Sequence, residues 1–258
     1  MKKTDKNIIR DLPEKNEMKV FCGLTEEQAS LYEAHIQDMM SKIENTEGIT
    51  RKGLILSTLL RLKQICDHPA LYLGDNSRLA GRSEKLDRIS EMIAELLIKD
   101  EKILVFTQFV KMGERIVRYL SKETGKEILF FHGQLSKKNR DEILDKFGDP
   151  ANKSSPIMVA SLKAGGLGLN LTSANNVFHF DRWWNPAVEN QATDRVYRIG
   201  QSKNVQVYKF ITVGTLEENI DSLMEEKSKL ARGVLKSGED WLTELSTDEL
   251  REIISLKR

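Results

Sequence analysis

Short apolar runs alternate with amphipathic stretches along most of the chain. From about Ser83 onward, each apolar run is followed by a segment whose apolar positions recur at helical spacing. Unbroken apolar runs of this kind are typical of parallel strands that are buried on both faces. The runs predict strands within residues 102–109, 127–133, 154–161, 174–181 and 205–211. Strands that alternate with helices predict an α/β fold, in which a mostly parallel sheet carries helices on both faces.

Residues 1–82 show a different pattern, which is helical and irregular. Thr25 and Gln28 have the spacing of a capping box and begin one amphipathic helix. A second helical run must end before Pro69, because the residue ahead of a proline avoids helical geometry. The sequence therefore predicts a helical segment ahead of the α/β part, and the pattern assigns no strand to it.

Composition indicates a globular protein with a locally uneven charge. Of the 258 residues, 40% are hydrophobic and 31% are charged, which allows a sizeable core. The formal net charge is only +1, so the chain as a whole is not a polycation. Residues 51–85 nevertheless hold seven Lys or Arg against three Asp or Glu, whereas residues 214–258 hold seven against eleven. A local site for a polyanion is possible without a high overall charge.

The use of cysteine and histidine argues against a disulfide-linked protein and against a metal-binding protein. Cys22 and Cys66 are the only cysteines, and the four histidines are scattered, so the sequence predicts neither a disulfide framework nor a metal site. No run approaches the roughly 18 apolar residues of a membrane-spanning helix, and the N-terminal segment has no apolar core of a signal peptide. We therefore expect an intracellular protein without a membrane partner.

A glycine-rich turn lies within residues 161–186, SLKAGGLGLNLTSANNVFHFDRWWNP. It follows an apolar run, as a phosphate-binding loop does, but no Gly-Lys-Ser/Thr completes it. Glycines such as Gly166 and Gly168 permit close approach of the backbone, so N–H groups could face a phosphate with Ser161 and Lys163 nearby. The alternative is a tight strand–helix turn in which the glycines serve packing alone.

Residues 185–201, NPAVENQATDRVYRIGQ, contain the start and stop signals of a helix. Asn185 suits the N-cap, Pro186 suits the first helical position, and Gly200 is typical of the residue that follows a helix. The preceding strand places this helix at the carboxyl edge of the sheet, where open α/β folds bind ligands.

Charged and polar residues share one face of this predicted helix. Gln191, Arg195 and Arg198 stand at positions i, i+4 and i+7, and Asp194 could pair with Arg198 four residues later. Two arginines and a glutamine on one face predict an anion site. The alternative is a solvated charged face without a ligand.

Several segments together resemble a known family. ILVFTQF, FFHGQLSKKNR, residues 161–186 and QATDRVYRIGQ occur in the order and spacing of the later helicase motifs of the SWI2/SNF2 family, and the match covers nearly the whole chain. That family consists of superfamily 2 ATPases, the Snf2-like DNA translocases, which move on double-stranded DNA. The resemblance implies a RecA-like fold of the P-loop NTPase type. It assigns residues 83–258 to the second, C-terminal RecA-like lobe with its closing helices, and residues 1–82 to the lobe junction and a helical insertion.

The resemblance also assigns a nucleotide-facing set of residues. Arg195 and Arg198 match the two family arginines that act on ATP as arginine fingers. The nucleotide-binding set consists of Gln191, Asp194, Gly166 and Gly168. The chain has no GxxxxGK[ST] motif, which in the family belongs to the first lobe. The resemblance therefore implies that ATP and Mg²⁺ are held mainly by an N-terminal lobe. One departure is Tyr197, where the family often has histidine.

A second set of residues is expected at DNA. Trp184 matches the family tryptophan that precedes Asn-Pro at the DNA groove, and the alternative is a core residue. The rest of this set is Ser161, Lys163, Asn170 and Arg140, of which Arg140 could instead be an ordinary surface arginine. Lys63 is at best a candidate for a basic patch. We expect contacts to backbone phosphates without sequence specificity.

The function implied is that of the C-terminal motor lobe of an ATP-dependent double-stranded DNA translocase or remodeller. This chain alone is expected to be inactive. Its expected partners are duplex DNA, the N-terminal RecA-like lobe and a DNA-bound protein target, in a cytoplasm, nucleoid or nucleus. The alternatives are a non-catalytic interaction module of RecA-like fold and the lobe of a strand-separating superfamily 2 helicase.

Overall fold

The computed structural model describes residues 12–162, 169–230 and 240–257. The chain divides into two compact units that are each discontinuous in sequence. The sheet unit comprises Met1–Val20, Ser90–Phe180 and Pro186–Lys209, and the helical unit comprises Phe21–Ile89, Asp181–Asn185 and Phe210–Arg258. This division follows spatial contacts. The division at residue 82 follows motif order, and it stays a prediction.

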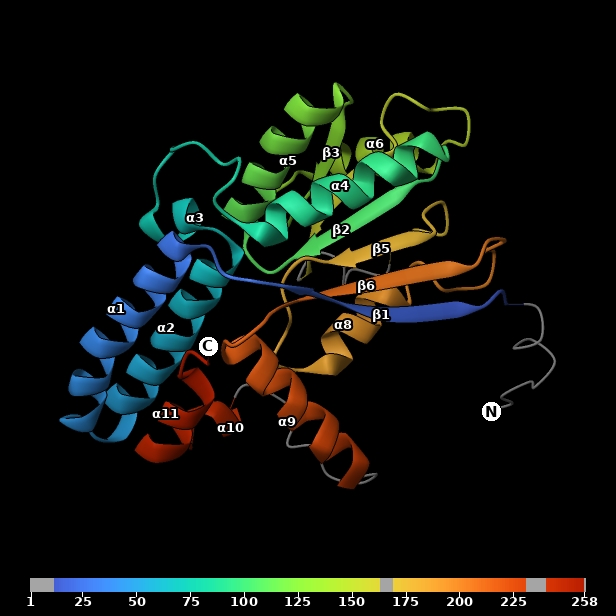
Figure 1. Ribbon diagram of the computed structural model, residues 1–258. Helices are drawn as coiled ribbons and strands as arrows, with labels where there is room; N and C mark the ends of the chain where they lie inside the picture. The colour runs from blue at the N-terminus through green and yellow to red at the C-terminus, as the bar shows by residue number, and fades with distance from the viewer. Residues whose placement is uncertain (1–11, 163–168, 231–239, 258) are drawn as a thin grey trace. The chain divides into compact units, whose positions relative to one another are not determined.

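Within the residues that the structure describes, six parallel strands form the sheet (Figure 1). They are β1 (Lys15–Cys22), β2 (Ile103–Thr107), β3 (Ile128–Phe131), β4 (Ile157–Ser161), β5 (Asn176–His179) and β6 (Val205–Thr212), in the spatial order β1-β6-β5-β2-β4-β3. Strands β2 to β6 pair in parallel. Strand β1 is parallel too, because Val205 N–H donates to Glu14 C=O and Val213 N–H donates to Cys22 C=O. The expected RecA-like α/β fold is confirmed.

Strand β1 was not expected from the sequence. Its residues, KNEMKVFC, form no unbroken apolar run, and most of them are exposed or half-buried. The reason is its place at one edge of the sheet, where polar side chains can face solvent. By contrast, every residue of β2, β4 and β5 is buried, which is why these strands have the apolar runs that predict them.

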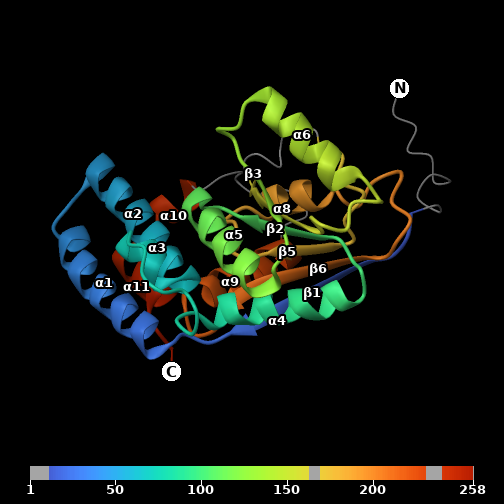
Figure 2. The same cartoon turned by 90° about the horizontal axis from the view of Figure 1, so that it is seen from above.

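Helices cover both faces of the sheet. Helices α4 (Glu84–Ile98) and α5 (Val110–Thr124) lie on one face, and α6 (Lys137–Gly148) and α8 (Pro186–Thr193) lie on the other (Figures 1 and 2). The two-sided cover excludes water from the central strands, so that Val105, Val159 and Phe178 are fully buried. The carboxyl edge of the sheet remains the place where loops can present side chains.

The helical unit is built around a second hydrophobic cluster. Its helices are α1 (Glu26–Glu44), α2 (Gly48–Asp67), α3 (Pro69–Leu73), α9 (Leu216–Leu230), α10 (Asp240–Thr243) and α11 (Thr247–Ile254). The capping box of Thr25 and Gln28 is present, and α2 ends two residues before Pro69, as the sequence predicts. Gln28 also donates to the carbonyls of Ile65 and Cys66, which fixes the start of α1 against the end of α2.

Candidate functional site

The segment with the two arginines is not the continuous helix that its sequence predicts. Helix α8 begins at Pro186, as expected, but it ends at Thr193, and residues 194–200 form a series of turns, here named the arginine turn. In a longer helix the carbonyl of Arg195 would accept from Ile199. Instead, it accepts from Leu171 N–H at 2.9 Å. The prediction of a helix through this segment is therefore wrong, and the carbonyl of Arg195 bonds to a residue outside the segment.

The turn changes how the candidate residues are arranged. Gln191, Asp194 and Arg198 are exposed, and Arg195 is half-buried. The expected ion pair between Asp194 and Arg198 is absent from the described part of the chain, since the break in the helix removes the i, i+4 geometry. The Nε of Arg195 is buried and meets no hydrogen-bond partner among the described residues. The two arginines therefore share one turn, but they do not share one helix face.

A buried hydrogen bond fixes the end of α8 at the carboxyl edge of the sheet. His179, the last residue of β5, lies with its Nε2 2.9 Å from the hydroxyl of Thr193. The ring of His179 stacks on Phe106, with 5.5 Å between the ring centroids. The arginine turn begins directly after Thr193, so it starts at the carboxyl edge of the sheet, where open α/β folds bind ligands.

The structure describes only some of the other candidate site residues of the sheet unit. Ser161 is the last residue of β4 and is only 4% exposed, whereas Asn170 is exposed. The Nη2 of Arg140 donates to Gly133 C=O at 2.5 Å, which closes the turn between β3 and α6. Lys163, Gly166 and Gly168 lie outside the described residues. DNA contact by this set stays a prediction.

Trp184 belongs to the hydrophobic cluster of the helical unit. Its side chain is 4% exposed and packs with residues of α2 and α9. The Nζ of Lys63 lies 4.4 Å from the centroid of its ring, which is a cation–π distance. This burial is what the alternative interpretation, a core residue, predicts. Contact between Trp184 and DNA stays a prediction.

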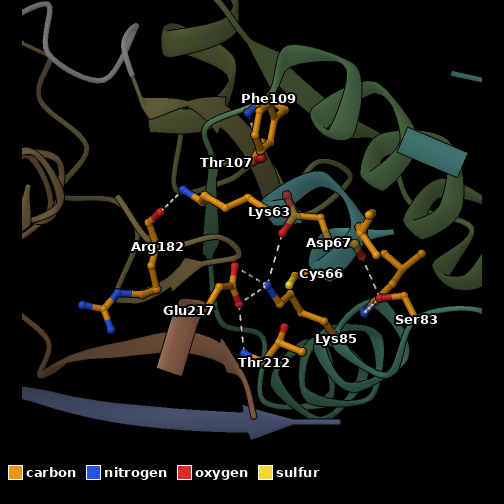
Figure 3. A network of polar contacts seen from close by, with 12 residues as sticks. Lys63, Cys66, Asp67, Ser83, Lys85, Thr107, Phe109, Arg182, Thr212 and Glu217 are labelled. Carbon is orange, nitrogen blue, oxygen red and sulfur yellow. Dashed lines mark hydrogen bonds and ion pairs between the residues drawn. The ribbon is translucent and has the colours of Figure 1, made fainter. Parts of the chain in front are cut away.

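Two charged contacts hold the backbone beside Trp184. The Nζ of Lys63, a fully buried lysine of α2, donates to the carbonyl of Arg182 (Figure 3). The guanidinium of Arg182 in turn forms an ion pair with Asp221 on α9. Sequence reasoning missed this role for Lys63, because a single lysine on a helix ordinarily predicts an exposed side chain.

A buried ionic cluster lies within the helical unit (Figure 3). The Nζ of Lys85 contacts Asp67 Oδ1 at 3.2 Å and the two carboxylate oxygens of Glu217 at 3.0 and 2.8 Å. Glu217 also accepts from Thr212 N–H at 2.9 Å. All three charged side chains are at most 1% exposed. The cluster therefore joins α2, α4, α9 and the end of β6 within this unit.

The pKa values in this cluster reflect two opposing effects. Burial by itself would lower the pKa of Lys85, but the negative charges of Glu217 and Asp67 outweigh it and raise the pKa above its ordinary value. Burial raises the pKa of Asp67 well above its ordinary value, against the opposing effect of Lys85. The cluster therefore favours the charged form of Lys85, and one carboxyl oxygen, Asp67 Oδ2, has no hydrogen-bond partner among the described residues.

Other kinds of site are not found in the part of the chain that the structure describes. Within these residues no group of three or more His, Cys, Asp or Glu could hold a metal ion. Cys22 and Cys66 are both buried, with free thiols. No described helix combines the length and the apolar character that crossing a membrane would require.

Comparison with known proteins identifies the family. The model of the helicase conserved C-terminal domain matches residues 84–200, and that of the SNF2-related domain matches residues 1–71. YwqA of Bacillus subtilis, named as an ATP-dependent helicase/translocase, is 51% identical over 98% of this chain and 27% of its own length. The chain thus spans about a quarter of the length of the curated relatives it matches.

Solved structures agree with this match. The SWI2/SNF2 ATPase C-terminal domain of Sulfolobus solfataricus is 49% identical, with a TM-score of 0.82 over 95% of this chain and 100% of that domain. The ATPase core of the same organism in complex with double-stranded DNA is 52% identical, with a TM-score of 0.85 over 99% of this chain and 53% of that one. This chain therefore belongs to the SWI2/SNF2 family of helicase-like ATPases and corresponds to the C-terminal domain of the family's ATPase core.

Proposed function

We propose that this chain is the C-terminal motor lobe of an ATP-dependent double-stranded DNA translocase or remodeller. In this role Arg195 and Arg198 act as arginine fingers on ATP and Mg²⁺ that an N-terminal RecA-like lobe mainly holds. The observation that carries the proposal is the arginine turn itself. A buried guanidinium N–H that lacks a partner costs free energy, and the Nε of Arg195 has none among the described residues, which favours an external acceptor such as a phosphate oxygen.

The chemistry of phosphoryl transfer suits these residues. The reaction needs charge stabilisation at the transferred phosphoryl group more than it needs covalent chemistry. Arginine stays charged at every physiological pH, and its planar fork can bind two phosphate oxygens at once. Exposed Gln191 and Asp194 lie on the same short segment, where they can help order the nucleotide.

Duplex DNA is the proposed polymer on which the lobe moves. A relative that is 52% identical was solved as an ATPase core with double-stranded DNA, which supports the same partner for this chain. Ser161, Lys163, Asn170, Arg140 and Trp184 are the proposed DNA-binding residues. The protein target that lies on the DNA is a further proposed partner.

Two alternatives differ from this proposal in what they require. A non-catalytic interaction module would not need two arginines on one turn at the carboxyl edge of the sheet. A strand-separating superfamily 2 helicase would use the same arginines, and it would separate duplex strands in an unwinding assay. The segments DRWWNP and DRVYRIGQ favour the translocase.

The 258-residue chain by itself is expected to show no measurable ATP hydrolysis. Its sequence has no GxxxxGK[ST] motif, so it lacks the lysine that grips the phosphates in this class of ATPase. A turnover assay with and without duplex DNA tests this, with the two-lobe enzyme as the positive control. Steady turnover by the chain alone would contradict the prediction. If that turnover also survived replacement of both Arg195 and Arg198 by alanine, the role of the arginines would be wrong as well.

Duplex binding by the same chain is expected to be weak, independent of sequence and strongly dependent on salt. Contacts to phosphates release counterions, and one lobe reaches few phosphates, so the dissociation constant should lie near the non-specific range of about 10⁻⁴–10⁻⁶ M. Fluorescence anisotropy with two unrelated labelled duplexes, repeated over a salt series, measures both properties. An affinity that ignores salt, or a marked preference for one duplex, would rule out the proposed mode of binding.

A further inference from the structure

One buried glutamine forms hydrogen bonds to backbone carbonyls of the arginine turn. Gln201 directly follows that turn and is 6% exposed. Its side-chain Nε2 lies 2.8 Å from Ala174 C=O, 3.2 Å from Thr172 C=O and 3.3 Å from Val196 C=O. Its Oε1 accepts from Lys203 N–H at 3.0 Å. A side-chain amide has two N–H donors, so both are used here and one is shared.

These contacts join two segments that are distant in sequence. Val196 lies in the arginine turn, whereas Thr172 and Ala174 lie in residues 171–174, which lead from the glycine-rich turn to β5. The same two segments are joined a second time by the hydrogen bond from Leu171 N–H to Arg195 C=O. Gln201 and this backbone bond together therefore fix the arginine turn against residues 171–174 within the sheet unit.

A reversal of the backbone at Gly200 places Gln201 next to the arginine turn. Gly200 has a φ of +102°, a conformation that residues with a side chain rarely adopt. After this reversal, Gln201 N–H donates to Arg198 C=O at 2.9 Å. Gln201 thus bonds through its backbone to one arginine residue, and through its side chain to the carbonyl of Val196, which directly follows the other.

We propose that Gln201 is a positioning residue, whose side-chain amide holds the arginine turn so that Arg195 and Arg198 meet the phosphates of ATP. This inference rests on the proposed function. Its physical basis is that misplacement of a catalytic group by about 1 Å can cost about 10²-fold in rate. Because ATP is held mainly by the other lobe, loss of the glutamine should lower kcat and leave KM nearly unchanged.

The test uses two substitutions at this position in the two-lobe enzyme. Gln201→Glu keeps the length of the side chain but replaces the donor with a carboxylate oxygen that would face three carbonyl oxygens. Gln201→Met keeps the length and removes the donor without adding a charge. We expect kcat to fall by about 10²-fold for Gln201→Glu and by less for Gln201→Met, with KM for ATP and duplex affinity close to wild type. Thermal unfolding of each variant shows whether it is folded at the assay temperature.

A matched control and a parallel variant separate the outcomes. Gln37→Glu makes the same chemical change at an exposed position of α1 and should leave turnover unchanged. If Arg198→Ala eliminates turnover but both folded Gln201 variants have a normal kcat, this inference is wrong and the proposed function stands. If Arg198→Ala keeps normal turnover, the proposed function fails and this inference fails with it. A raised KM with normal kcat, or a loss of folding in both variants, would also overturn the positioning role.

Discussion

We expect that replacing Arg198 with alanine abolishes ATP turnover in the two-lobe enzyme and leaves duplex binding almost intact. An arginine finger contributes about 10³–10⁵-fold to the rate of this class of reaction, so a loss of that size is expected. Arg198 is the better arginine for the test because its side chain is exposed, whereas Arg195 is half-buried and its loss would also disturb packing. Steady-state ATPase rates with and without duplex, together with duplex affinity, measure the two effects separately.

The conservative substitution sharpens this prediction. Arg198→Lys keeps the positive charge but cannot bind two phosphate oxygens at once, so it should also lose most of the turnover. Arg118→Ala is a matched control, because Arg118 is an exposed arginine on α5, a helix on the face of the sheet opposite α8 (Figure 2). Normal turnover in Arg198→Ala would show that this residue does not act on the nucleotide. Full activity in Arg198→Lys would show that charge alone is sufficient.

Most of the sheet could be predicted from the sequence, for a physical reason. Strands that are covered by helices on both faces need apolar side chains at every position, so β2, β4 and β5 have unmistakable runs. Strand β1 has no such run because it lies at an exposed edge. Hydrophobic patterning therefore predicts the interior of this sheet and fails at its margin.

The sequence predicts which candidate residues lie in the arginine turn, but it does not predict the backbone conformation of that segment. Caps, spacing and helix propensity all favour a helix through residues 185–199. Where the helix would continue, Leu171 N–H donates to the carbonyl of Arg195, and the side chain of Gln201 donates to that of Val196. Leu171 belongs to a segment that is distant in sequence. The pattern of residues 185–199 alone therefore cannot predict this hydrogen bond. The same limit applies to Lys63 and Lys85, which are fully buried although lysine ordinarily predicts an exposed side chain.

The buried ionic cluster leads to the second large effect, a strong loss of stability in Lys85→Met. Methionine has a similar volume to lysine, but it would leave the buried carboxylates of Asp67 and Glu217 without their shared cation. Removal of one partner from a buried charge cluster costs about 3–5 kcal/mol in the free energy of unfolding. Urea unfolding of the 258-residue chain, followed by tryptophan fluorescence, measures this. All three tryptophans of the chain (Trp183, Trp184 and Trp241) belong to the helical unit, so the signal reports on the unit that holds the cluster.

The dependence on pH distinguishes a charge effect from a packing effect. Asp67 already has a pKa well above its ordinary value because of its burial, and the loss of Lys85 removes the main opposing effect, so the pKa rises further. A carboxyl whose pKa is higher in the folded state than in the unfolded state binds more protons when folded. Its contribution to stability is therefore full at low pH and is lost as the pH rises through the folded-state pKa. The destabilisation of Lys85→Met relative to wild type should therefore be smaller at a pH at which the Asp67 carboxyl is protonated in both folded proteins than at a higher pH, where only the wild type has a cation beside the carboxylate.

A surface lysine provides the control for both measurements. Lys42 pairs with Asp38 on α1 at 2.7 Å, but both side chains are more than half exposed, so Lys42→Met should cost at most about 1 kcal/mol. A loss of stability in Lys85→Met no larger than that of Lys42→Met would show that the cluster is not the electrostatic centre of the helical unit. A large loss that stays the same over the whole pH range in which the protein folds would assign the effect to packing, because a charge effect must weaken where the carboxyl is protonated.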